Sequence, residues 1–163
     1  MKITTFGLDL AKNVFQLHWV EPQTGEVKRR ALKRDQMIKF FAQRSASVVA
    51  MEACGSAHYW ARKLIELGHE ARLIAPQFVR PFVRSNKTDA ADAAALLEAA
   101  RSPDIRSVRV KSIEQQALQC LHRTRSIWVA TRTARINALR GFCREFGIAF
   151  ARGSKRGIDQ IAR

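Results

Sequence analysis

The stretch ITTFGLDLAKNVFQLHWV, residues 3–20, does most to predict how this chain folds. Ile3 to Leu10 is rich in β-branched and aromatic residues, which favours a strand, and Asp9 stands near its end. Asn13 to Val20 predicts a second strand that follows almost at once. A third strand, Glu26 to Leu32, comes after the turn EPQTG, so the opening unit is predicted to be an antiparallel meander.

Beyond this meander the chain alternates between helical and strand patterns. Helices are predicted over Asp35–Arg44, Ser56–Leu67, Gln77–Val83 and Asp89–Arg101, and buried strands over Ser47–Glu52 and Glu70–Ile74. Asp35 and Ser56 are predicted to cap their helices. Three antiparallel strands followed by alternating helices and strands predict an α/β fold, a mixed sheet with helices on both faces. The ribonuclease H-like architecture, to which RuvC belongs, has this order of elements.

The last third of the chain has a different character. Ser112 to Phe146 contains no proline, and its apolar residues recur at helical spacing, which predicts one long basic helix ending near Gly147. A 4-3 alternation predicts packing against another helix along a thin seam, and this seam consists of Ile113, Ala117, Cys120, Thr124, Ile127, Thr131, Ala134 and Ala138. Trp60, Trp128 and Phe142 are predicted to be core residues. The predicted domains are residues 1–103, the helix at 104–147, and a linker to a further domain at 148–163.

The charge of the chain predicts a polyanionic partner. The 163 residues carry a formal net charge of +15. Up to Ala100 there are 15 basic and 10 acidic residues, whereas the remainder holds 14 and 4, so most of the positive field lies in the last third. Nucleic acid is favoured over an acidic membrane surface, because that segment lacks a broad apolar face. Three scattered cysteines and no apolar run of membrane-spanning length predict a cytoplasmic protein.

Four carboxylates stand where predicted strands end and a helix begins. Asp9 and Glu52 end strands, and Asp89 and Asp92 lie three residues apart at the start of a helix. Taken alone, Asp89 and Asp92 fit a helix cap and a favourable helix-dipole interaction. If the first and fourth strands are neighbours, however, all four acids can meet at the carboxyl edge of the sheet. Converging carboxylates favour Mg²⁺ or Mn²⁺, and two such ions about 4 Å apart suit phosphodiester displacement.

These acids lie within motifs that carry a family resemblance. GLDLAKN around Asp9, MEACG around Glu52 and NKTDAADA around Asp89 and Asp92 resemble the D-E-D-D signature of the DEDD transposases of bacterial insertion sequences. That family is related to the pilin-gene (Piv) invertases. INALRGFCREFGIAFARG, residues 136–153, is similar to the end of its helical linker, so the resemblance covers nearly the whole chain.

The resemblance implies a RuvC-like N-terminal domain of a DNA-cutting and DNA-joining enzyme. Its Mg²⁺ or Mn²⁺ ions, two in number, would be held by Asp9, Glu52, Asp89 and Asp92. The long helix would be a coiled-coil element of a homodimer or larger homo-oligomer. Family members have a further C-terminal domain whose serine takes part in strand transfer. Some use a structured guide RNA, which the basic helix could serve as readily as DNA.

Basic residues near the acids and along the helix are candidates for phosphate contact. They are Lys12, Lys87, Arg123, Arg125, Arg132, Arg135, Arg140 and Arg144. The near-absence of acidic neighbours along the helix favours phosphate contact there, while a solvated surface is the alternative.

Three other functions compete with a transposase. A sugar-kinase or actin-like ATPase would need a glycine- and threonine-rich hairpin after Asp9, where this chain has Lys12 and Asn13. A nucleic-acid-binding and dimerisation module without chemistry would have no use for the acids. A site-specific DNA invertase of the same family would share this part of the sequence, so the sequence leaves that alternative open.

Overall fold

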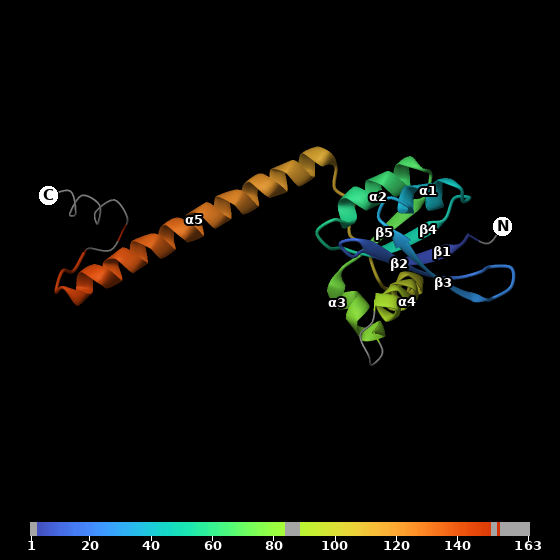
Figure 1. The fold of residues 1–163 in the computed structure, drawn as a ribbon, viewed down its shortest axis with the longest axis horizontal. Coiled ribbons are helices and arrows are strands. Elements are labelled where there is room, and N and C mark those ends of the chain that lie inside the picture. Colours follow the sequence, from blue (N-terminus) through green and yellow to red (C-terminus); the bar gives the residue numbers. More distant parts are fainter. Residues whose placement is uncertain (1–2, 84–88, 151–152, 154–163) are drawn as a thin grey trace. The chain divides into compact units, whose positions relative to one another are not determined.

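The computed structural model describes residues 3–83, 89–150 and 153, without the side chains of residues 89 and 90. It divides into two compact units, Met1–Ser112 and Ile113–Arg163. The first unit is an α/β fold built on one five-stranded sheet (Figure 1). The strands are β1 (Thr5–Asp9), β2 (Val14–Val20), β3 (Val27–Lys33), β4 (Val48–Glu52) and β5 (Glu70–Ile74). The helices are α1 (Met37–Ala42), α2 (Ala57–Glu66), α3 (Pro76–Val79), a 3-10 turn (Arg80–Phe82), α4 (Asp89–Arg101) and α5 (Ile113–Glu145).

The sheet is mixed, as the sequence predicts, and its strand order is β3-β2-β1-β4-β5. β1, β2 and β3 form the antiparallel meander, while β4 and β5 run parallel to β1. The meander forms because short turns join its strands, and Gly25 takes a φ of 71° in the turn between β2 and β3. The parallel strands instead need helical crossovers, which α1 and α2 supply.

Each face of the sheet carries its own apolar cluster. Figure 1 shows α1 and α2 over one face and α3 and α4 over the other. Because side chains alternate along a strand, Phe6 and Leu8 of β1 join the cluster beneath α1 and α2. Ala50 of β4 instead belongs to the cluster beneath α3 and α4.

Gly7 allows α4 to approach β1 closely. A Cβ at this position would overlap the carbonyl oxygen of Ala93 and lie 2.9 Å from the backbone nitrogen of Leu97. A side chain therefore cannot be accommodated without moving the helix backbone. This contact fixes α4, which carries two of the four predicted acids, against the strand that carries Asp9.

The second unit contains the predicted long helix. α5 runs from Ile113 to Glu145 and ends before Gly147, whose φ of 74° matches a left-handed helix terminus. All of α5 lies within the described residues, and none of its side chains is buried. The prediction that Trp128 and Phe142 are core residues is therefore wrong for this chain, since they are 68% and 66% exposed, whereas Trp60 in α2 is a core residue.

One of the two predicted helix caps is wrong, because the N-cap of α1 is Gln36 instead of Asp35. Ser56 is the N-cap of α2 as predicted, although its side chain makes no capping hydrogen bond. Both helices are held by burial of apolar residues such as Phe41 and Leu64, so they form without a side-chain cap. Of the helices that the structure describes, none is long and apolar enough to cross a membrane.

Candidate metal and nucleic-acid site

Asp9 and Glu52 lie next to each other in the sheet. β1 and β4 are parallel, and their register pairs Gly7 with Ala50 and Leu8 with Met51. The next pair in this register is Asp9 and Glu52, the last residues of their strands. Both carboxylates are half-buried, and both share the strand face of Gly7 and Ala50, which is the face that α4 covers. The predicted meeting of these two strand ends is therefore present in the fold.

Asp92 belongs to the helix that covers this face. It lies in the first turn of α4, is half-buried, and directly precedes Ala93, the residue in close contact with Gly7. Asp89 is the first residue of α4, and its side chain lies outside the described residues. The backbone thus assigns three acids from three separate segments to one face of the sheet.

A complete metal-binding cluster is not present among the described side chains. No group of three or more histidine, cysteine, aspartate or glutamate side chains is close enough to hold an ion there, although Asp89 is outside that search. The donor chemistry nevertheless suits a hard cation, because half-buried carboxylate oxygens are the ligands that Mg²⁺ and Mn²⁺ prefer. Asp9, Glu52 and Asp92 are the described residues that could contribute such oxygens.

A basic residue that the sequence analysis missed lies at the same edge of the sheet. Arg34 follows β3, and its guanidinium lies 5.0 Å from the ring centre of Trp60 and 5.8 Å from that of Phe15. Its Nη1 donates a hydrogen bond of 3.4 Å to the carbonyl oxygen of Lys12, in the turn after Asp9. The cation thus lies over two aromatic rings and close to the predicted Lys12. Its position just after a strand that ends at the acidic edge is the signal that could have found it.

The family of the chain follows from comparison with known proteins. A family model named for the DEDD transposases of the IS110 group, and described as a transposase, matches residues 6–147. The chain belongs to this family. The match includes Asp9, Glu52, Asp89 and Asp92, together with all of α5.

Curated relatives of this DEDD-family chain are transposases by name. A "Probable family 20 transposase" of Pseudomonas aeruginosa is 57% identical over 152 residues, which cover 93% of this chain and 45% of that protein. The "Putative transposase y4pF/y4sB" of Sinorhizobium fredii is 45% identical over 155 residues, with coverages of 95% and 40%. The "Transposase for insertion sequence element IS1111A" of Coxiella burnetii is 41% identical over 159 residues, with coverages of 98% and 44%. The chain therefore spans less than half the length of these relatives.

Most of the other predicted nucleic-acid contacts that fall within the described residues are exposed. Lys12 is exposed, and Lys87 lies outside the described residues. Arg140 of α5 is half-buried, and the other five predicted arginines of this helix are exposed: Arg123, Arg125, Arg132, Arg135 and Arg144. Arg140 Nη2 donates a hydrogen bond of 2.9 Å to the carbonyl oxygen of Gly153. The helix thus offers its positive charge to a partner.

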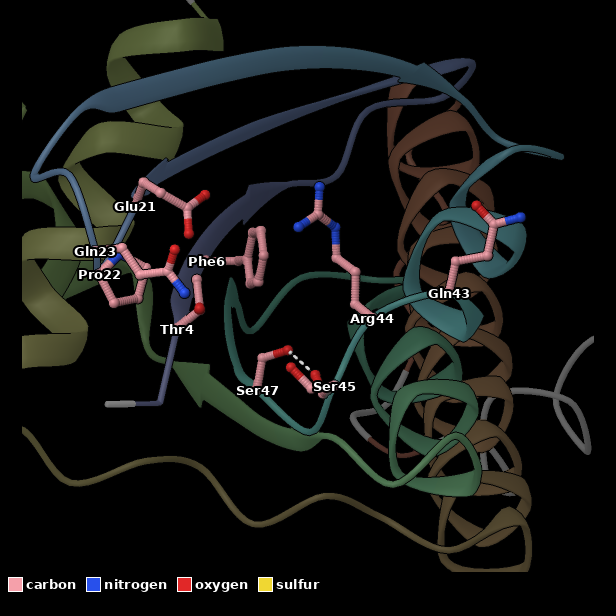
Figure 2. Close-up of a pocket in the computed structure, with 9 residues that line it drawn as sticks. All are labelled: Thr4, Phe6, Glu21, Pro22, Gln23, Gln43, Arg44, Ser45 and Ser47. Carbon is pink, nitrogen blue, oxygen red and sulfur yellow. Dashed lines mark hydrogen bonds between the residues drawn. The ribbon is translucent and has the colours of Figure 1, made fainter. Parts of the chain in front are cut away.

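A separate cavity of about 520 Å³ lies at the opposite end of β1 from the acids (Figure 2). Its lining comes from the start of β1, the turn after β2 and the end of α1, and includes Phe6, Glu21 and Arg44. The Arg44 guanidinium lies 4.2 Å from the ring centre of Phe40, and burial lowers the pKa of this group. Because Phe6 is near the start of β1 and Asp9 is at its end, this cavity is no part of the acidic edge.

Proposed function

We propose that this chain is the metal-binding part of a transposase that cuts and rejoins DNA phosphodiesters during movement of an insertion sequence. Asp9, Glu52, Asp89 and Asp92 would hold two Mg²⁺ or Mn²⁺ ions. The observation that carries this proposal is the parallel pairing of β1 with β4, whose last pair is Leu8 and Met51, so that Asp9 and Glu52 end neighbouring strands on the face that α4 covers in a member of the DEDD family.

The sheet order supports a ribonuclease H-like, RuvC-type fold as part of this proposal. In that architecture an antiparallel meander is extended by two parallel strands, and the acids lie at the carboxyl edge of the first and fourth strands. The order β3-β2-β1-β4-β5 and the positions of Asp9 and Glu52 match this description.

The acids would bind metal ions, and the basic residues would bind phosphates. Bound divalent ions would stabilise charge on the attacking and leaving oxygens of the DNA backbone. The carboxylates of Asp9, Glu52, Asp89 and Asp92 would fix the positions of those ions. Lys12 and Arg34 would hold the phosphates of the strand at the same edge, where positive charge orients the polyanion, and Lys87, which is outside the described residues, is a third candidate for this role. Arg34 suits this role because its stack on Trp60 limits its movement.

The long helix would contribute both pairing and binding. Its apolar side chains are exposed, including Ile127 at 65%, which supports packing against a second copy as a homodimer or larger homo-oligomer. Its arginines would contact DNA, or a structured guide RNA, through phosphates.

Calorimetric titration with Mn²⁺ tests the metal site. We expect the chain to bind Mn²⁺ with micromolar to millimolar affinity, and Asp9→Asn, Glu52→Gln and Asp92→Asn each to weaken binding by about tenfold or more. Glu66→Gln is the matched control, because Glu66 is an exposed acid of α2 that pairs with Lys63. Equal affinity for Mn²⁺ in the wild type and all four variants would contradict the proposed site. A nucleic-acid-binding module without chemistry would give that result.

A further inference from the structure

A cluster of basic side chains holds the segment that leads from the first unit into α5. Arg62 Nη1, in α2, donates a hydrogen bond of 2.7 Å to the carbonyl oxygen of Lys111. The backbone N–H of Lys111 donates to Nδ1 of His58 at 3.2 Å, and Lys111 Nζ lies 3.0 Å from Nε2 of the same ring. Upstream, the N–H of Val108 donates to the carbonyl oxygen of Leu73 at 2.6 Å, so Lys111 is held by backbone as well as side-chain contacts.

This cluster has more hydrogen-bond donors than acceptors. A neutral imidazole offers one acceptor nitrogen, because its other nitrogen carries a proton. Lys111 presents a donor to each ring nitrogen of His58, through its backbone N–H and its ammonium group. One of the two ring nitrogens of His58 carries a proton in either tautomer, and that N–H then faces a donor of Lys111 at about 3 Å. An anionic oxygen that accepts from both members of that pair would remove the conflict.

The positive charge of the cluster also favours binding of an anion. Arg62 and Lys111 are both half-buried, and neither has an ion-pair partner among the described residues. The pKa of His58 is lowered by burial and then by the positive charges of Lys111 and Arg62. Two cations and a buried ring are thus packed together without a compensating carboxylate, an arrangement that is costly unless an anion joins it.

The cluster stands at the same edge of the sheet as the acids. α2 begins shortly after Glu52, the last residue of β4, so the first turn of α2 lies beyond the carboxyl end of that strand. His58 belongs to this turn and Arg62 to the next. A bound anion would therefore lie at the same edge of the sheet as the acids, on the side where α2 packs.

We infer that His58, Arg62 and Lys111 form a phosphate-binding site that holds a backbone phosphate of nucleic acid beside the acidic edge. The three side chains are the basis for proposing that a phosphate binds here. The identification of the polyanion as nucleic acid rests on the proposed function. Arg62 and Lys111 supply the positive charge, and His58 supplies an N–H.

Histidine NMR tests the site in the absence of any divalent ion. Inorganic phosphate is added to the 163-residue chain, with sodium chloride at matched ionic strength as the reference. We expect phosphate to shift the His58 ring signals and to raise the pKa of His58, because a bound anion stabilises the imidazolium. Lys111→Gln and Arg62→Gln should each weaken phosphate binding by about tenfold, since each removes a charged donor. Lys111→Arg, which keeps the charge, should restore it.

Lys63→Gln is the matched control, because Lys63 is a lysine of α2 next to Arg62 that already pairs with Glu66. It should leave the His58 response to phosphate unchanged. The phosphate site is overturned if phosphate shifts the His58 signals no more than sodium chloride does. It is also overturned if Lys63→Gln weakens phosphate binding as much as Lys111→Gln.

A second arm identifies the source of the phosphate. Short duplex DNA is titrated at several salt concentrations, and Lys111→Gln should reduce the slope of log affinity against log salt by about one. If inorganic phosphate binds but this slope does not change, the site takes free phosphate and its assignment to nucleic acid is wrong. Because no divalent ion is present, neither arm depends on whether the proposed Mn²⁺ site exists.

Discussion

At the scale of single residues, Gly7 is the position where the fold tolerates least change. It joins the two parts of the proposed site, because it precedes Asp9 in β1 and touches the backbone of α4 just after Asp92. We expect Gly7→Ala to lower the free energy of unfolding by about 1–3 kcal/mol or more, since the new methyl group meets backbone that cannot rotate away. Urea denaturation measures this loss. Gly55→Ala is the control, because a Cβ there would meet nothing within 4 Å. Similar losses in the two variants would contradict the close contact.

Two buried histidines predict how the stability of the first unit depends on pH. The pKa values of His18 and His58 lie below their ordinary value of 6.5, mainly because burial disfavours the charged ring. Arg29 adds to this effect at His18, as Lys111 does at His58. Below pH 6.5 the unfolded chain therefore binds more protons than the folded chain. We expect the free energy of unfolding in urea to be constant just above that pH and to fall as the pH drops below it. A value that stays level or rises down to about pH 5.5 would show that these rings are not buried as described.

At the scale of elements, the sequence predicts strands, helices and the N-cap of α2 well, but it misses the N-cap of α1 and the packing partner of α5. Phe6 and Leu8 of β1 and Leu17 of β2 are buried on one face of the sheet. The resulting alternation of apolar residues can be recognised within the sequence of each strand. Capping depends on local geometry at residues such as Gln36, which a pattern of apolar residues does not reveal. The exposure of Trp128 could not be predicted, because helical spacing records that a side chain packs but not whether its partner belongs to the same chain.

The proposed pairing of α5 can be tested with two matched threonines. Thr131 belongs to the seam and is half-buried, whereas Thr133 is exposed and, two residues away, points about 200° round the helix. Each aspartate substitution adds the same charge, but only the one on the seam would bury an unpaired carboxylate between helices. We therefore expect Thr131→Asp to raise the dimer dissociation constant by about tenfold or more, and Thr133→Asp to change it little. Analytical ultracentrifugation measures both. Equal effects, or a wild-type chain that stays monomeric at high concentration, would contradict a coiled-coil seam.

At the scale of the whole molecule, the sequence could predict part of the candidate site because strand ends gather at one edge of a sheet. Asp9 and Glu52 each stand at the end of an apolar run, and the fold pairs their strands in parallel. For Arg34 the sequence offers only its position just after a strand that ends at this edge, and for Lys111 it offers no such signal. Their roles arise from contacts with Trp60 and His58, which are far away in sequence and lie in no shared pattern. What the fold adds to the sequence is therefore the set of cations around the acids.

If acids from separate segments hold the same metal ions, paramagnetic broadening of backbone NMR signals will show it. Mn²⁺ added below one equivalent broadens the signals of residues near it. We expect the signals at Asp9, Glu52 and Asp92 to broaden together at the lowest additions, while those near Glu66 stay sharp. Asp9→Asn should reduce the broadening at all three positions. Broadening confined to one of these segments, or spread evenly over the exposed acids, would contradict a shared metal site.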